Sequence, residues 1–238
     1  MARSLSRNKI IWILSAISLV IMVSVLVFTG NLWLNKLFAL KYSVKGIDVS
    51  HYQMNISWQK AAGSGIRFVF IKASEGSTNK DASFQQNWEG AKDAGLIRGA
   101  YHYFTLASAG KMQAANFISC VPLESGCLPP VIDLEEMGAD EQIFRSELDD
   151  FISAVESRFG QKPILYVVYP VYDRYIRGYY DDYPIWIRDM AFPPRLSDGR
   201  GWLFWQYCDR GRVEGISTFV DLDVFSGSSN ELEALLSN

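Results

Sequence analysis

From Val44 onward, extended apolar segments alternate with segments of helical periodicity, and this alternation limits the folds open to the chain. Segments rich in β-branched and aromatic residues are expected as strands at 44–50, 68–74, 97–105, 128–135 and 163–169. Between them, apolar positions recur near helical spacing at 58–62, 84–94, 108–118 and 141–159. Strands joined by helical crossovers favour a parallel sheet.

The pattern changes after the fifth of these strands, because short Gly- and Pro-rich connections replace the helices. Strands are expected there at 185–187, 202–208 and 219–225, followed by an amphipathic turn at 231–236. Eight strands over roughly 200 residues predict a TIM-like α/β barrel in which the last helices are shortened or lost. An open, doubly wound sheet is the alternative, but the sequence contains neither G-x-G-x-x-G after the first strand nor G-x-x-x-x-G-K-[ST].

The N-terminal part of the chain differs sharply in charge from the rest. Residues 1–42 hold five of the 23 basic residues and none of the 26 acidic ones, so residues 43–238 have a net charge of −8. This acidic body argues against nucleic acid as a partner, because binding to phosphate backbones depends on clustered Lys and Arg.

Residues 10–28 carry no charge and would span about 28 Å as a helix, enough to cross a bilayer. We expect a short N-terminal segment at 1–9, a transmembrane signal-anchor at 10–28, a juxtamembrane stem at 29–43 and a folded domain at 44–238. A cleaved signal peptide is the competing interpretation, but its apolar core would be about 7–15 residues and end in a small-x-small site. Basic residues flank the segment on both sides and leave its orientation open.

Carboxylates occur on three expected strands that are otherwise apolar. Period-two alternation separates Asp48 from its apolar neighbours, and it places Asp133 with Glu135, and Asp221 with Asp223, on single strand faces. Burial of an unpaired carboxylate costs several kcal/mol, so these positions are hard to explain by packing alone. In a parallel barrel such side chains converge at the mouth formed by the C-terminal strand ends.

Converging carboxyls raise one another's pKa, so one stays protonated beside an ionised neighbour. Cleavage of a glycosidic bond needs such an acid and carboxylate. In one alternative, these carboxylates are isolated turn residues or salt-bridge partners without a catalytic role. In another, they bind magnesium or calcium.

A zinc site is not expected, because the chain has only His51 and His102 and no C-x-x-C motif; both histidines are expected as scaffold. Cys120 and Cys127 could pair in an oxidising compartment or remain thiols.

Several motifs in order resemble those of one enzyme family. They are GIDVSHYQ at 46–53, FVFIKASEG at 68–76, F-x-x-N-x-x-x-A-x-x-A-G-L at 84–96, GAYHYF at 99–104, VIDLEE at 131–136, PILYVVY at 163–169, PIWIRD at 184–189, WQY at 205–207 and VDLDVFSG at 220–227. The chain from about Lys45 to Gly227 is similar to the lysozymes of glycoside hydrolase family 25. These N-acetylmuramidases cleave peptidoglycan between N-acetylmuramic acid and N-acetylglucosamine.

The resemblance implies an incomplete (β/α)5β3 barrel with Glu135 as the proton donor. It gives Asp133 the role of supporting the substrate's acetamido group or acting as nucleophile or stabiliser, and Asp48 and Asp221 complete the catalytic cluster. No cofactor or metal is implied. The chain departs from the family pattern at 54–58, at Arg188 and at Asp223.

Aromatic rings stack on sugar faces while their polar edges bind hydroxyls, so residues near the strand ends are expected to bind substrate. The candidates are Tyr101, Tyr103, Tyr166, Trp186, Trp205, Gln206 and Asp223. For each aromatic residue, packing inside the barrel is the competing interpretation.

We therefore expect a monomeric, single-pass lysozyme of the cytoplasmic membrane. Its partners would be peptidoglycan glycan strands and the lipid bilayer, with the catalytic domain facing the periplasm or cell exterior. The alternatives are a non-catalytic glycan-binding barrel and a metal-dependent hydrolase.

Overall fold

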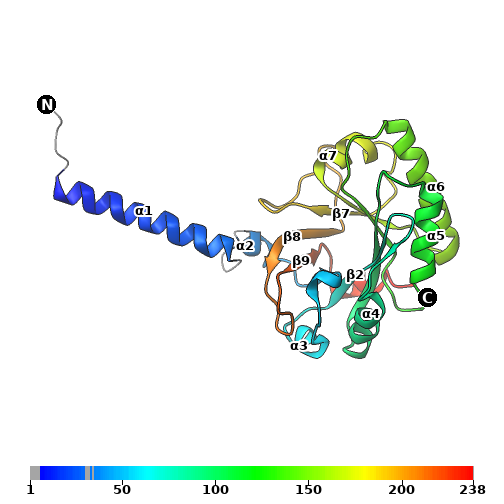
Figure 1. Ribbon diagram of the computed structural model, residues 1–238, viewed down its shortest axis with the longest axis horizontal. Helices are drawn as coiled ribbons and strands as arrows, with labels where there is room; N and C mark the ends of the chain where they lie inside the picture. Colours follow the sequence, from blue (N-terminus) through cyan, green and yellow to red (C-terminus); the bar gives the residue numbers. More distant parts are fainter. Residues whose placement is uncertain (1–5, 30–32, 34, 238) are drawn as a thin grey trace. The chain divides into compact units, whose positions relative to one another are not determined.

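The computed structural model describes residues 6–29, 33 and 35–237, in two compact units, Met1–Leu34 and Asn35–Asn238. In the first unit, helix α1 (Arg7–Phe28) is long and apolar enough to cross a membrane, and none of its residues is buried (Figure 1). The second unit begins inside the segment expected as a stem: α2 (Asn35–Ala39) packs on the barrel, where Asn35 Nδ2 donates to the carbonyl oxygen of Asp189 at 2.9 Å. Residues 30–32 and 34 of that segment lie outside the described residues.

A sheet in the second unit closes into a barrel, because β1 (Lys45–Val49) pairs with both β2 (Phe68–Glu75) and β9 (Val220–Phe225). Around the barrel the strands follow the order β1-β9-β8-β7-β6-β5-β4-β2. The remaining barrel strands are β4 (Ile97–Tyr103), β5 (Val131–Leu134), β6 (Ile164–Val167), β7 (Ile185–Arg188) and β8 (Phe204–Gly211). The α/β barrel predicted from the sequence is thus confirmed.

Helices cover the outside of the barrel (Figure 1). They are α3 (Trp58–Gly63), α4 (Phe84–Asp93), α5 (Gly110–Cys120), α6 (Glu141–Phe159), α7 (Tyr169–Val171) and η2 (Tyr172–Ile176). The short helix η1 (His51–Gln53) follows β1, and α8 (Ser229–Glu233) contributes Leu232 to the apolar residues of the barrel interior. The boundaries of α6 follow from local chemistry. The Asp140 side chain caps its first turn by accepting from two backbone amides, and Gly160 ends it with a φ of 70°.

Two details of the sheet differ from the expectation of eight strands pointing the same way. A short strand, β3 (Asn79–Lys80), adds antiparallel to the end of β2. β9 runs antiparallel to both β8 and β1, because the short connection after β8 contains no crossover helix. Asp221 therefore lies at the start of its strand rather than the end, and it pairs directly with Asp48.

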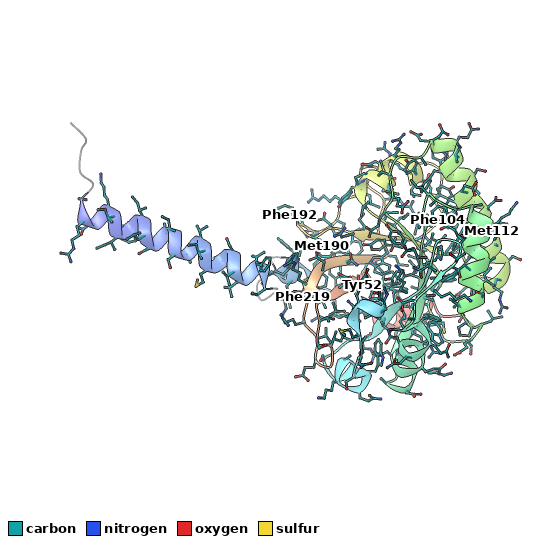
Figure 2. The ribbon with its side chains drawn as sticks, in the orientation of Figure 1. Tyr52, Phe104, Met112, Met190, Phe192 and Phe219 are labelled. Carbon is teal, nitrogen blue, oxygen red and sulfur yellow. The ribbon has the colours of Figure 1, made fainter. Side chains whose placement is uncertain are left out.

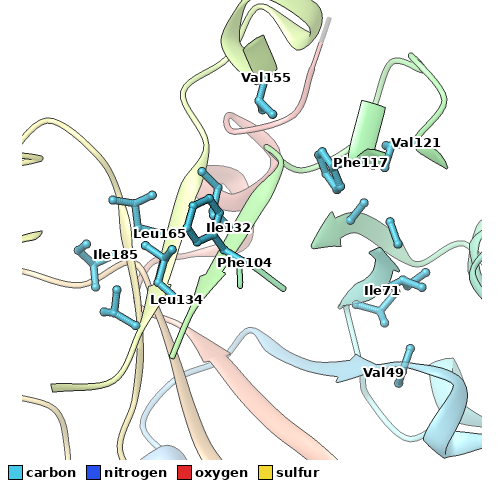
Figure 3. Close-up of a cluster of buried hydrophobic side chains, with 14 of the residues drawn as sticks. Val49, Ile71, Phe104, Phe117, Val121, Ile132, Leu134, Val155, Leu165 and Ile185 are labelled. Atoms are coloured by element: carbon cyan, nitrogen blue, oxygen red, sulfur yellow. The ribbon is translucent and has the colours of Figure 1, made fainter. Parts of the chain in front are cut away.

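Alternation along the strands separates two apolar layers. One layer lies between sheet and helices, where Ile132 and Leu134 of β5 and Val155 of α6 belong to one buried cluster (Figure 3). Phe104 belongs to this layer, whereas Met112 is exposed on α5 (Figure 2).

The other layer fills the barrel interior. An interior aromatic cluster, defined as Phe68, Phe70, Trp186 and Phe204, joins strands from opposite sides of the barrel. The rings of Phe70 and Trp186 stack with their centroids 4.6 Å apart, and those of Phe68 and Phe204 are 5.1 Å apart. This packing excludes water from the barrel on the N-terminal side of the polar residues at its mouth.

Two glycines make room for the interior aromatic cluster. A Cβ at Gly46 would lie 2.2 Å from the Phe68 ring, and one at Gly99 would lie 2.7 Å from the Phe70 ring. Both distances are far below van der Waals contact, so any side chain here would force the rings to move.

We predict that Gly46→Ala lowers the free energy of unfolding by about 1–3 kcal/mol, the usual cost of overpacking. Gly63→Ala is the matched control, because nothing lies within 4 Å of a Cβ at that position. Thermal or urea unfolding of residues 35–238 measures both. Equal stability of the two variants would contradict the close packing described for Gly46.

Candidate active site

A cavity of about 290 Å³ opens at the mouth of the barrel, where the parallel strands end and β9 begins. Its lining residues are Asp48, Tyr101, Asp133, Glu135, Tyr166, Trp186, Arg188, Gln206, Asp209 and Asp221. The four carboxylates expected to be catalytic are all among them. Four of the seven expected substrate-binding residues, Tyr101, Tyr166, Trp186 and Gln206, also line the cavity.

A chain of hydrogen bonds fixes one wall of this cavity. The Tyr166 hydroxyl donates to Gln206 Oε1 at 2.8 Å, and Gln206 Nε2 donates to Asp48 Oδ2 at 2.8 Å. All three groups are buried or nearly so: Tyr166 is 4%, Gln206 5% and Asp48 7% exposed. The amide of Gln206 thereby holds the Asp48 carboxyl in one orientation.

Asp48 meets two further carboxyls contributed by β9. Burial raises the pKa of Asp48, and the charge of Asp223 raises it further. Burial also raises the pKa of Asp221 to about 9, with the charge of Asp48 as the next cause. Repulsion and desolvation thus favour the protonated forms of these acids near neutral pH.

Asp133 lies near the end of β5, and Glu135 follows two positions later on the same side of the chain. Burial raises the pKa of Asp133 well above its ordinary value, and the charges of Glu135 and Asp48 add to the effect. Lys72 and Arg188 act in the opposite direction. Asp133 Oδ1 is buried and makes no hydrogen bond to any described residue, so it is free to accept one from a ligand.

The other expected residues lie outside the cavity lining. Tyr103 is at the end of β4, where burial and then the charges of Asp133 and Glu135 raise its pKa to about 12, so it adjoins the acid pair. Asp223 is fully buried and accepts from Trp186 Nε1 at 3.1 Å. It therefore supports the cavity wall instead of facing the cavity.

Trp205 does not suit the expected role in stacking on a sugar. It is 0% exposed, its Nε1 donates to the carbonyl oxygen of Asp189 at 2.8 Å, and its ring packs against those of Trp202 and Tyr207. Neighbouring Gln206 lines the cavity, so Trp205 projects from the opposite face of β8. Trp205 is therefore a packing residue and not a sugar-binding one.

Sequence reasoning did not identify Asp209 as a site residue, and it treated Arg188 only as a departure from a family pattern. Arg188 follows Trp186 by two positions and could have been found by alternation. Asp209 could not, because the pairing of β8 shifts register between Gln206 and Cys208 and again before Gly211.

The histidines and cysteines lie outside the cavity lining. His102 is fully buried between Ser74 Oγ and Gln113 Oε1, and burial lowers its pKa to about 4, so it is a neutral scaffold residue. All three cysteines have free thiols. Among the described residues, no group of three or more His, Cys, Asp or Glu side chains is arranged to hold a metal ion.

Comparison with known proteins places this geometry in a family. Residues 47–216 match the model of the glycosyl hydrolases family 25. A solved family 25 glycosyl hydrolase from Bacillus anthracis is 39% identical, with a TM-score of 0.78 over 82% of this chain and 94% of that chain. Among curated proteins, lysozyme M1 of Streptomyces globisporus is 34% identical over 82% of this chain and 72% of its own. The uncharacterized protein YegX of Escherichia coli strain K12 is 38% identical over 84% of this chain and 78% of its own.

The pKa of Asp221 predicts a specific pH dependence of stability. A carboxyl whose pKa rises on folding costs nothing below the unfolded value near 4, and the cost grows as the pH rises toward about 9. We expect Asp221→Asn to stabilise the fold by up to about 5 kcal/mol at pH 8 and by almost nothing at pH 4.

Thermal unfolding of residues 35–238 at several pH values measures this difference. Asp182→Asn is the matched control, since that carboxylate is 87% exposed and lies 3.7 Å from Lys162 at the surface. A gain from Asp221→Asn that did not vary with pH would contradict the raised pKa.

Proposed function

This chain belongs to the glycosyl hydrolases of family 25 and acts on peptidoglycan, and we propose that it is an N-acetylmuramidase anchored in the cytoplasmic membrane. The bond cut would be the β-1,4 linkage between N-acetylmuramic acid and N-acetylglucosamine. The observation that carries this proposal is the carboxyl pair of Asp133 and Glu135 in the cavity at the barrel mouth.

In the proposed reaction, Glu135 donates its proton to the glycosidic oxygen as the bond to the anomeric carbon breaks. The reaction would start from the form in which the single proton of the pair lies on Glu135 and Asp133 is ionised. The unpartnered Asp133 Oδ1 can then accept the N–H of the substrate's acetamido group. This contact orients the acetamido carbonyl oxygen toward the anomeric carbon.

Two retaining pathways fit this arrangement. In one, the acetamido oxygen bonds to the anomeric carbon, and water later displaces it while ionised Glu135 takes the water's proton. In the other, Asp133 itself bonds to the anomeric carbon before water does the same. Both return a proton to Glu135 and leave the enzyme unchanged.

The aromatic residues of the cavity have different roles in this proposal. Trp186 is 2% and Tyr166 4% exposed, and both hydrogen-bond to other polar side chains of the wall, so they orient Asp223 and Gln206. Tyr101 is only half-buried and lines the cavity, which suits it to contact a sugar ring.

The membrane part of the proposal is supported by α1. Its 22 residues give a helix of about 33 Å, and its mean hydropathy is 2.8. Peptidoglycan lies outside the cytoplasmic membrane, so residues 1–9 would be cytoplasmic and the barrel would face the periplasm or exterior. Basic residues at both ends do not select an orientation by themselves.

We predict that Glu135→Gln lowers kcat on purified peptidoglycan by about 10²–10⁴-fold, the usual contribution of a general acid. Glu136→Gln is the matched control, because Glu136 is the next residue and its Oε2 instead accepts from the backbone amide of Leu106 at 2.8 Å. Mass spectrometry of the products should find muramic acid at the new reducing ends. Glucosamine at those ends, or full activity of Glu135→Gln, would contradict the assignment.

We also predict that the expressed chain stays in the membrane fraction after alkaline carbonate washing, with residues 1–28 still present by intact mass. The same chain begun at Asn35 should be released as a soluble enzyme, since Asn35–Asn238 is a compact unit. A mature protein lacking residues 1–28 would support a cleaved signal peptide and contradict the anchor.

A further inference from the structure

One cation faces five carboxyls in the cavity. Ten residues line it, and they include Asp48, Asp133, Glu135, Asp209 and Asp221, whereas Arg188 is the sole basic residue among them. Arg188 ends β7 and pairs in register with Gln206, whose amide holds Asp48. The guanidinium is therefore part of the wall at which substrate must bind.

The guanidinium of Arg188 makes no hydrogen bond to another described residue. Its Nη2 lies 3.9 Å from Asp209 Oδ2, which is beyond hydrogen-bond distance, and the two side chains are 37% and 38% exposed. Within the described part of the chain, no other carboxylate oxygen lies within ion-pair distance and no hydrogen bond involves this guanidinium.

Lys72, a cation near this site, differs from Arg188 because it is paired within the protein. Its Nζ lies 2.6 Å from Glu75 Oε2, its side chain is 13% exposed, and it sits over the Tyr103 ring. Lys72 also lies outside the lining of the cavity. The contacts of Lys72 within the protein account for its charge. The hydrogen-bond donors of Arg188 have no such partners among the described residues.

The surrounding acids leave the charge of Arg188 available to a ligand. Burial and mutual repulsion raise the pKa values of Asp48 and Asp221, so these two groups favour their neutral forms. An anionic group of a ligand can therefore approach Arg188 without meeting five full negative charges. A planar guanidinium binds a carboxylate through two parallel hydrogen bonds.

We propose that Arg188 is an anion subsite that binds a carboxylate of the substrate's muramoyl unit, which makes it a specificity-determining residue. This inference rests on the proposed muramidase function. The carboxylate can come from two sources: the lactyl ether of muramic acid where no stem peptide is attached, or the stem peptide itself.

Substrates that differ only in carboxylates provide the test. One pair is peptide-free glycan strands with free lactyl carboxylates, and the same strands after conversion of these groups to methylamides. A second pair is strands with intact stem peptides, before and after the same conversion of the peptide carboxylates. For each pair, kcat and KM are measured from new reducing ends with the full chain.

The quantity compared is the ratio of kcat/KM on the carboxylate form to that on its methylamide form. We expect Arg188→Gln to lower this ratio about tenfold, mainly through KM, as for loss of a charge-assisted hydrogen bond. Arg188→Lys should retain part of the preference, because it keeps the charge without the planar fork. Arg158→Gln, an exposed arginine near the end of α6, is the matched control.

The substrate pair for which Arg188→Gln loses the preference for the carboxylate form identifies the source of the bound carboxylate. If Arg188→Gln changed kcat equally on the carboxylate and methylamide substrates, Arg188 would influence only the catalytic acids. That result would overturn the proposed anion subsite. Equal ratios for the native chain and Arg188→Gln in both pairs would also overturn it. Absence of cleavage of every form by the native chain would instead refute the muramidase function and the subsite with it.

Discussion

Desolvation of the carboxyls at the barrel mouth depends on the apolar residues that precede them. On the parallel strands, the inward-facing position two residues before a polar mouth residue is apolar: Val131 precedes Asp133, Trp186 precedes Arg188 and Phe204 precedes Gln206. The interior aromatic cluster therefore removes water from one side of the site. Burial is the main cause of the raised pKa values of Asp48 and Asp221, so these values depend on that packing.

The closing strand β9 determines how the acids meet. Because β9 is antiparallel, it brings Asp221 opposite Asp48 and Asp223 opposite Gln206. Three carboxyls from two neighbouring strands thus share one wall, while Asp133 of β5 and Glu135 just after it lie several strands away around the barrel. This separation places Asp133 and Glu135 across the cavity from a cluster that is held by hydrogen bonds to Gln206 and Trp186. Burial raises the pKa values on both sides of the cavity, and a buried carboxyl oxygen without a hydrogen-bond partner occurs on each side, Asp133 Oδ1 and Asp223 Oδ2.

Local periodicity was sufficient to predict the parallel part of this fold and its acids. The strand carrying Asp133 and the helix at 141–159 have one clear period each, and both occur where expected. The direction of β9 was not predicted, although the short connection after β8 leaves no room for a crossover helix and so favours antiparallel pairing. The register shifts in β8 hid Asp209. Trp205 and Gln206 were both expected in the site, although strand alternation puts neighbouring residues on opposite faces and allows only one of them to line the cavity. Tertiary pairing, which no single segment encodes, decided these cases.

Tethering would also restrict where an enzyme of this kind can act. Residues 29–34 separate the end of α1 from Asn35, and six fully extended residues reach at most about 20 Å. If the proposed anchor holds, the barrel would be confined to glycan close to the membrane surface, where its effective concentration would be high and distant strands would be out of reach. Asn35 is fully buried and its side chain bonds to the backbone of Asp189, which immediately follows Arg188. The first residue of the barrel unit is therefore joined by a hydrogen bond to the residue that follows Arg188 of the cavity wall.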